Sequence, residues 1–363
     1  MANNTNLGAA KAAKNDEFYT QYADIQKEVN AYLEYNPETF RDKTVLLPCD
    51  DPEWSNFTRF FAQNFERLGL KRLISTSYAV ESKKYKDYEP TLFETESPLF
   101  DIDKTRIKGK IFELTRDTNG SGRIDIDDLE WHYLEGDGDF RSPEVCSLRD
   151  QSDIIVTNPP FSLFREFISW IMEAHKQFLI IGHQGAVGYK EIFPLIKDNR
   201  LWLGIGFTGG AAHFYSPYED YAVAGDHKKG MIRVSGVTWF TNLEHGRRHE
   251  PLKLMTMKDN LRYGKHKDLI ERGGYERYYH YNFIDVPYTD AIPSDYNEEM
   301  GVPITYLAKH CPEQFEILGM STFFATAKPE GLPKSKQGGP QFYVFRDGEY
   351  VRMYNRIIIR KKQ

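Results

Sequence analysis

Residues 153–161, DIIVTNPPF, constrain the fold of this chain more than any other stretch. The β-branched run predicts a buried strand, and the two prolines stop it because a proline has no N–H to extend a ladder or a helix. Residues 162–172 then repeat apolar side chains at three- and four-residue steps, which predicts a helix with one buried face. Residues 178–182, FLIIG, predict the next strand. We therefore expect a βαβ unit with Asn158 at the carboxyl end of a strand, where open α/β sheets bind ligands.

Four residues after this strand suit chemistry at an exocyclic amine: Asn158, Pro159, Pro160 and Phe161. The side-chain oxygen of Asn158 and the carbonyl of Pro159 can both accept hydrogen bonds from an NH₂ group. Two fixed acceptors that draw a conjugated nitrogen towards tetrahedral geometry stabilise a transition state, and no basic side chain is required. The ring of Phe161 offers a face on which a base can stack. We expect these four residues to be catalytic. The alternative for the tetrad alone is a proline turn with a core phenylalanine.

The tetrad resembles the signature of amino-group methyltransferases that use S-adenosylmethionine. Residues 153–167 as a whole resemble the corresponding segment of the EcoRI-type adenine-specific DNA methyltransferases. Matching phrases recur in the same order along the chain to about residue 319: residues 15–22, 49–57, 136–142, 301–307 and 312–316. The resemblance implies a Rossmann-like S-adenosylmethionine-dependent methyltransferase sheet with helices on both faces, and a C-terminal target-recognition region. It implies transfer of a methyl group to N6 of an adenine flipped out of double-stranded DNA, in or derived from a restriction-modification system.

The same resemblance marks cofactor-binding residues near the N-terminus. Phe18, Tyr19 and Thr20 resemble the segment that in the family lies over the methionine end of the cofactor. Residues 43–49 predict the first strand of the sheet, and Asp50, Asp51 and Pro52 follow it. A carboxylate at this strand tip can hold the amino group or the ribose of the cofactor. The glycine-rich turn of most methyltransferases is missing here, a departure that the EcoRI-type enzymes share.

A second candidate pair of cofactor residues is Asp139 and Phe140. In many amino-methyltransferases an Asp-Phe pair receives the adenine of the cofactor, the carboxylate accepting from its NH₂ group and the ring packing on its face. The alternative is an acidic turn with one buried aromatic. Residues 73–78 predict a second strand without an acid at its end, and Glu81 is the nearest candidate for a ribose contact.

The chain divides by pattern into a cofactor-binding and catalytic methyltransferase domain, residues 1–242, and a DNA-contacting region, residues 243–363. Residues 79–135 are expected to be an insertion or a hairpin region. The formal net charge of −6 argues mildly against a polyanionic partner. Between residues 228 and 281, however, twelve Lys or Arg stand against six Asp or Glu, with tyrosines interleaved. The C-terminus adds Arg356, Arg360, Lys361 and Lys362. This pattern predicts a DNA footprint, with an ordinary solvated face as the alternative.

Other features set limits on the kind of protein. Three scattered cysteines without a Cys-x-x-Cys spacing predict reduced thiols, a cytoplasmic protein and no zinc site. No long apolar stretch predicts a membrane span. Residues 117–125 match a calcium hand through position 9, but position 12 is Asp128, so a structural turn and a calcium loop both stay open. His183, His245 and His249 are expected on loops as surface or DNA-contacting residues. We expect no catalytic metal, and a monomer.

Three other functions fit parts of this pattern. Cytosine N4 methylation and protein glutamine methylation present a similar nitrogen to the same acceptors. Cytosine enzymes more often have Ser in place of Asn158, and glutamine enzymes usually have Tyr in place of Phe161. The third is a catalytically inactive DNA-binding protein on the same scaffold, which the intact tetrad disfavours.

Overall fold

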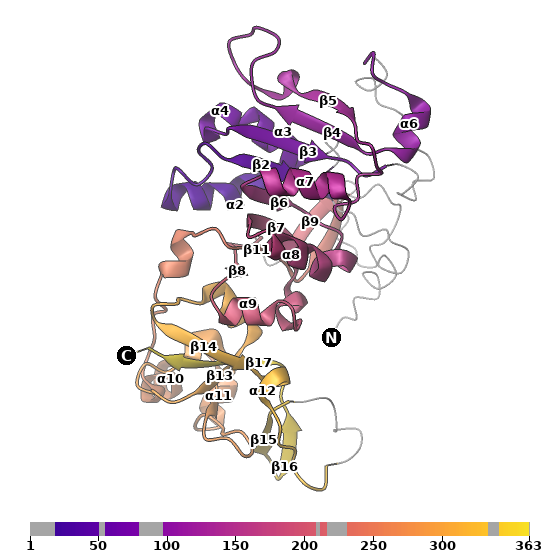
Figure 1. Ribbon diagram of the computed structural model, residues 1–363. Helices are drawn as coiled ribbons and strands as arrows, with labels where there is room; N and C mark the ends of the chain where they lie inside the picture. The colour runs from indigo at the N-terminus through magenta and orange to yellow at the C-terminus, as the bar shows by residue number, and fades with distance from the viewer. Residues whose placement is uncertain are drawn as a thin grey trace. The chain divides into compact units, whose positions relative to one another are not determined.

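The computed structural model describes residues 19–50, 55–79, 97–207, 211–215, 231–332 and 341–362. Phe18, Asp51, Pro52 and Glu81 therefore lie outside the described residues. The chain divides into two compact units. Unit 1 comprises Met1–Ala186 and Leu203–His245, and unit 2 comprises Val187–Trp202 and Gly246–Gln363. Figure 1 shows the elements of both.

An eight-stranded mixed sheet forms the centre of unit 1, in the order β5-β4-β3-β2-β6-β7-β11-β8 (Figure 1). Its central strands β3, β2, β6 and β7 run parallel, while β4, β5 and β11 pair antiparallel with their neighbours. The strands are β2 (Thr44–Leu47), β3 (Arg72–Thr76), β4 (Lys110–Leu114), β5 (Glu130–Tyr133), β6 (Ile154–Thr157), β7 (Gln177–His183), β8 (Trp202–Leu203) and β11 (Val237–Thr241). The predicted βαβ unit is present as β6, a short 3₁₀ turn, α8 (Phe164–Glu173) and β7.

Helices cover both faces of this sheet, as the sequence predicts. On one face, alternate strand residues such as Val45, Val156 and Ile181 share a core with three helices. These helices are α2 (Tyr22–Tyr35), α3 (Asn56–Gln63) and α4 (Phe65–Leu68). On the other face lie α7 (Pro143–Gln151) and α8 (Figure 1). There Phe164 packs on Phe240, with ring centroids 5.0 Å apart, and over Gly182, where an added Cβ would lie 2.4 Å from the Phe164 ring.

The stretch expected as an insertion or a hairpin region, residues 79–135, contains two strands that extend the sheet. Strand β4 pairs with β3, β5 pairs with β4, and α6 (Ile102–Ile107) precedes them. Between the two strands, Asp128 Oδ1 accepts from the backbone N–H groups of Thr118 (2.8 Å) and Asn119 (3.1 Å), and Asp117 Oδ1 accepts from that of Gly120. These are the hydrogen bonds of an Asx-type structural turn. Among the described residues, no group of three or more His, Cys, Asp or Glu side chains is placed to hold a metal ion.

A smaller sheet in unit 1 has the order β1-β9-β10. Its strands are β1 (Tyr19–Thr20), β9 (Ala211–Tyr215) and β10 (Met231–Ser235). Helix α2 follows β1 directly and is held by Glu28, a fully buried acid. Glu28 accepts hydrogen bonds from Tyr32 Oη (2.9 Å), Ile205 N (2.9 Å) and Gly206 N (3.2 Å). The middle of α2 and the segment after β8 are thereby fixed to each other.

Unit 2 contains a four-stranded sheet of order β12-β13-β17-β14 and a hairpin, β15-β16. Its strands are β12 (Ile284–Asp285), β13 (Met300–Pro303), β14 (Phe315–Met320), β15 (Tyr343–Arg346), β16 (Glu349–Arg352) and β17 (Arg356–Lys361). Its helices are α9 (Phe193–Lys197), α10 (Met257–Tyr263), α11 (Lys267–Glu271) and α12 (Ser321–Phe324).

Short 3₁₀ turns occur in both units. Among the described residues they span Ile126–Asp128, Phe161–Leu163, Gln184–Gly188, Gly246–His249, Thr289–Ala291 and Ile304–Lys309. A search of the described residues finds no helix with the length and apolar character that a membrane span needs.

A buried polar group lies at the centre of unit 2. Asp285 Oδ1 accepts from Arg356 Nε at 2.7 Å and from Tyr278 Oη at 2.6 Å. Asp285 is 1% exposed and Arg356 is 7% exposed. Both Arg356 and Tyr278 belong to the pattern that predicted a DNA footprint, and that part of the prediction is wrong, because their polar groups pair inside the unit.

Candidate functional site

Two neighbouring strand tips meet at the candidate site. Strands β2 and β6 are parallel, with Val45 opposite Ile154, so Asp50 and Asn158 follow their strands at the same edge of the sheet. Asp50 Oδ2 accepts a hydrogen bond of 2.6 Å from the hydroxyl of Thr157, the residue before Asn158. Asp50 is 7% exposed and Thr157 is fully buried. The carboxylate thus links the first strand of the sheet to the strand that carries the tetrad.

Asp50 also reaches a third strand and a helix. Its Oδ1 accepts from Ser55 Oγ at 2.9 Å, and its backbone oxygen accepts from Ser75 Oγ, on β3, at 3.1 Å. Ser55 caps helix α3, because its Oγ accepts from the N–H of Phe57 at 3.0 Å. Three strand tips and one helix start are therefore tied to a single acid.

The tetrad lies where the sequence predicts it, directly after β6. Asn158 is half-buried and its side-chain oxygen is shielded from solvent, while Pro159 is buried. Pro160 begins the 3₁₀ turn that leads into α8, and its carbonyl accepts from Leu163 N at 2.9 Å. Phe161 is half-buried and packs against the core of unit 1. Two consecutive prolines hold this turn rigid, so the Asn158 amide and the Pro159 carbonyl have little freedom to move.

The segment before α2 lies against the same helix start. Tyr19 and Thr20 form β1, and the backbone oxygen of Thr20 accepts from Asn56 Nδ2 at 2.8 Å. Asn56 follows Ser55, which contacts Asp50. The structure thus brings Thr20 and Asp50, two of the predicted cofactor residues, to adjacent residues at the start of α3.

Asp139 and Phe140 lie beside α8, the helix that follows the tetrad. Arg141 donates to both carboxylate oxygens of Asp139, from Nε at 2.9 Å and from Nη2 at 2.6 Å, and these bonds lower the pKa of Asp139. Arg141 also pairs with Glu166 of α8 at 3.0 Å. The ring of Phe140 is buried and meets Phe167 of α8 edge to face, with centroids 5.0 Å apart. The pair is therefore held to α8 by an ion pair and an aromatic contact.

Sequence reasoning missed Thr157, Ser55, Ser75 and Arg141 as parts of this site. Hydroxyl residues next to strand ends and helix starts were the available signal for the first three. The expectation for His245 was wrong: it is 3% exposed, its Nε2 lies 3.1 Å from Leu203 O, and its ring meets Tyr32. The three cysteines, Cys49, Cys146 and Cys311, are free thiols, as predicted.

An α/β sheet with helices on both faces, and an Asn-Pro-Pro-Phe turn at the tip of a central strand, define a methyltransferase of the class that modifies amino groups. The family described as "Adenine-specific methyltransferase EcoRI" matches residues 6–362. The chain therefore belongs to the EcoRI family of adenine-specific DNA methyltransferases, and the family that the sequence resembles is confirmed.

Two curated relatives extend this result. The chain is 40% identical over 323 residues to the Type II methyltransferase M.EcoRI of Escherichia coli, covering 87% of this chain and 89% of that protein. It is 34% identical over 364 residues to the Type II methyltransferase M.MpnI of Mycoplasma pneumoniae, covering 98% and 97%. No solved structure matches the chain significantly.

Proposed function

We propose that this enzyme transfers the methyl group of S-adenosylmethionine to N6 of an adenine flipped out of double-stranded DNA, as the modification enzyme of a restriction-modification system. The observation that carries the proposal is the pair of acceptors on Asn158 and Pro159, fixed at a strand tip by two prolines and by the Thr157–Asp50 hydrogen bond. Within a duplex the amine of an adenine is not accessible to a strand tip, so the base must leave the stack, at a cost of a few kcal/mol.

The tetrad supplies the contacts that this reaction needs. Asn158 Oδ1 and the Pro159 carbonyl accept the two amine hydrogens, and Phe161 stacks on the flipped base. As the nitrogen forms its new bond to carbon, its lone pair leaves conjugation with the ring and positive charge develops on it. Two oxygens already fixed beside the nitrogen stabilise that charge without reorganising. The proton released afterwards passes to water, so no side chain has to act as a strong base.

The residues around the strand tips fit the proposed methyl donor. S-adenosylmethionine supplies an electrophilic methyl group on a sulfonium, together with an amino group, a ribose and an adenine. A cationic ligand of this kind suits a site with carboxylates at Asp50 and Asp139 and the ring of the half-buried Phe161. We assign Phe18, Tyr19, Thr20, Asp50, Asp51 and Pro52 to the methionine and ribose side, and Asp139 and Phe140 to the adenine. Because Arg141 holds both oxygens of Asp139, it shares that carboxylate with the cofactor.

We also assign catalysis to residues 1–242, with 79–135 as an elaboration of the sheet, and target recognition to residues 243–363. The protein acts as a monomer on cytoplasmic DNA. Support for this division comes from the tetrad and its partners in unit 1 and from the exposed cations and aromatics of unit 2.

The test is incubation of the purified chain with duplex DNA of mixed sequence and labelled S-adenosylmethionine, followed by nucleoside analysis. N6-methyladenine is expected, and Asn158→Ala is expected to abolish it. Asn36→Ala, which removes an exposed amide after α2, serves as the matched control with unchanged activity. N4-methylcytosine, label in protein glutamine, or full activity of Asn158→Ala would each contradict the proposal.

A further inference from the structure

We infer that the exposed face of helix α10 that carries Lys258 and Arg262 contacts the phosphate backbone of duplex DNA, with Tyr263 beside it. The inference rests on the proposed function, because it takes DNA as the partner. Lys258 and Arg262 are four residues apart, so they share one face of the helix, and both are exposed. Asn260 points to the opposite side, where it is buried and donates to Ala291 O at 3.3 Å. The helix is thus anchored by one face and presents two cations on the other.

Three acids near α10 are engaged within the protein. Asp259 Oδ2 accepts from Thr256 Oγ1 at 2.7 Å, and Asp268 pairs with Arg272 at 2.6 Å. Asp290 pairs with Lys265 at 2.7 Å and lies 2.8 Å from His266.

Lys258 and Arg262 differ from these groups, since neither forms an ion pair with any residue in the described part of the chain. Lys267, at the start of α11, is exposed and also forms no ion pair within the described part of the chain. Glu271, at the end of α11, is an exposed acid. The face that carries Lys258 and Arg262 therefore presents positive charge to solvent. A DNA backbone, with its regularly spaced negative charges, is its complement.

Tyr263 adds an aromatic contact to this face. It is 67% exposed, and the guanidinium of Arg262 lies 5.2 Å from the centre of its ring. A ring this exposed gains little from packing in the free protein. Its hydroxyl can donate to a phosphate oxygen and its ring can cover a sugar, which are the contacts that position a protein on a duplex.

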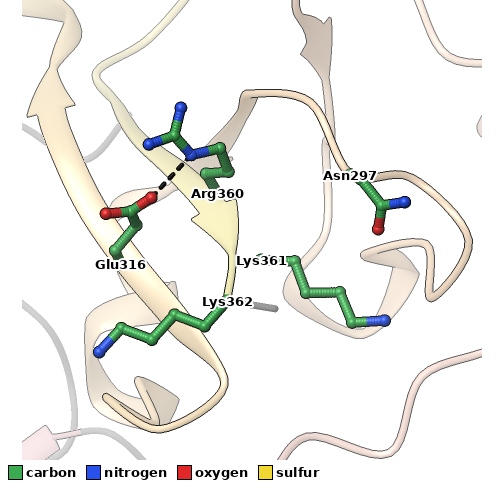
Figure 2. A pocket seen from close by; sticks show the side chains of 5 residues that line it. All are labelled: Asn297, Glu316, Arg360, Lys361 and Lys362. Atoms are coloured by element: carbon green, nitrogen blue, oxygen red, sulfur yellow. Dashed lines mark hydrogen bonds and ion pairs between the residues drawn. The ribbon is translucent and has the colours of Figure 1, made fainter.

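The cations near the C-terminus are a weaker candidate for the same role, although they line a pocket of about 750 Å³ (Figure 2). Arg360 pairs with Glu316 at 2.7 Å and with Glu299 at 3.3 Å, and Lys361 Nζ donates to Ser294 O at 2.8 Å. Arg360 is therefore ion-paired inside unit 2, and the ammonium group of Lys361 is held by a backbone carbonyl. Lys361 and α10 contact neighbouring residues of one loop, because Asp295, next to Ser294, accepts from Met257 N at 2.7 Å.

The experiment is the salt dependence of DNA binding, measured by fluorescence anisotropy. The labelled duplex is unmethylated and contains the site that the enzyme methylates. Each phosphate contact adds about 0.9 to the slope of log K against log salt for duplex DNA. Lys258→Ala/Arg262→Ala is expected to lower the slope by about 2. Tyr263→Ala is expected to weaken binding with the slope unchanged, since it removes no charge.

Lys190→Ala/Lys197→Ala is the matched control. It removes two lysines from another surface of the same unit, the pocket between α9 and α12. An unchanged slope in Lys258→Ala/Arg262→Ala would overturn the inference, and so would an equal loss of slope in the control, which would indicate a general charge effect. Failure of the parent protein to bind or methylate DNA would instead count against the proposed function. Thermal unfolding of each variant verifies that it is folded.

Discussion

The hydroxyl of Thr157 donates a 2.6 Å hydrogen bond to the carboxylate of Asp50, across 107 positions of sequence. The bond is buried and its acceptor is a carboxylate, and hydrogen bonds to charged groups contribute about 1.5–3 kcal/mol. Thr157 is covalently joined to Asn158, so this bond fixes the direction in which the tetrad leaves the sheet. Asp50 therefore positions the turn that we propose to be catalytic.

The first prediction concerns this bond. Thr157→Val keeps the shape and β-branching of the side chain and removes only the hydroxyl. We expect the single-turnover rate of methyl transfer to fall about tenfold, corresponding to about 1.4 kcal/mol, because Asn158 is held less rigidly. The affinity for S-adenosylhomocysteine, measured by calorimetry, is expected to change little.

Two further variants separate positioning from general damage at this site. Thr157→Ser retains the hydroxyl and is expected to restore most of the rate. Thr241→Val removes another buried hydroxyl of the same sheet, bonded to Phe178 O at 2.7 Å, and is expected to keep the parent rate. A Thr157→Val variant as fast as the parent would show that the bond has no role in positioning.

The second prediction concerns Phe161. Phe161 is half-buried against the core of unit 1, and we propose that its ring stacks on the flipped base, a contact worth about 1–3 kcal/mol per base. Phe161→Leu keeps apolar volume but loses the aromatic face. We expect weaker binding of a duplex with 2-aminopurine at the target position and a smaller rise in its fluorescence, with cofactor affinity retained. Phe161→Tyr, which keeps the face, is the control. Equal fluorescence changes in the Leu variant and the parent would contradict the stacking role.

The third prediction is a pH dependence of stability that comes from Glu28. Burial raises the pKa of Glu28 from 4.5 to about 7. The folded state then binds a proton more tightly than the unfolded state, so the free energy of unfolding falls as the pH rises from about 4.5 to about 7 and levels off above that. A pKa change of this size corresponds to at most about 3 kcal/mol.

Glu28→Gln removes this titration. Urea unfolding near pH 5 and near pH 8 is expected to show a smaller difference in stability for the variant than for the parent. Glu34→Gln, at an exposed position of the same helix, is the control and is expected to behave as the parent does. If the difference in unfolding free energy between pH 5 and pH 8 is the same in Glu28→Gln and in the parent, the pH dependence comes from other groups.

The fourth prediction concerns the buried ion pair of unit 2. Arg356→Met leaves the carboxylate of Asp285 buried beside Tyr278 without its cation, and breaking a buried pair in this way costs about 3–5 kcal/mol. Removing both charges in Arg356→Met/Asp285→Asn is expected to cost less than Arg356→Met alone. Chemical denaturation of the parent, the single variant and the double variant gives the free energy of unfolding of each and so compares the two costs. A double variant no more stable than the single variant would argue against an electrostatic origin.

Much of the site could be predicted from local sequence. The strand that ends at Thr157, the proline turn and the amphipathic helix are each written in consecutive residues, so periodicity alone places Asn158 at a strand tip. Other local signals misled. Arg356 and Tyr278 suggested a DNA surface, but charge along the chain does not reveal which groups pair inside the fold. For the same reason His245 looked like a loop residue, although it is buried.

The sequence by itself determined the family, the βαβ unit and the place of the tetrad at the tip of the first strand of that unit. The tertiary structure alone decided that Asp50 bonds to Thr157, that Arg141 bridges Asp139 and Glu166, and that Lys258 and Arg262 carry charge without an ion pair in the described part of the chain. The physical reason is that strand and helix formation follow from neighbouring side chains, whereas hydrogen bonds and ion pairs depend on which distant residues the packed core brings within about 3 Å of each other.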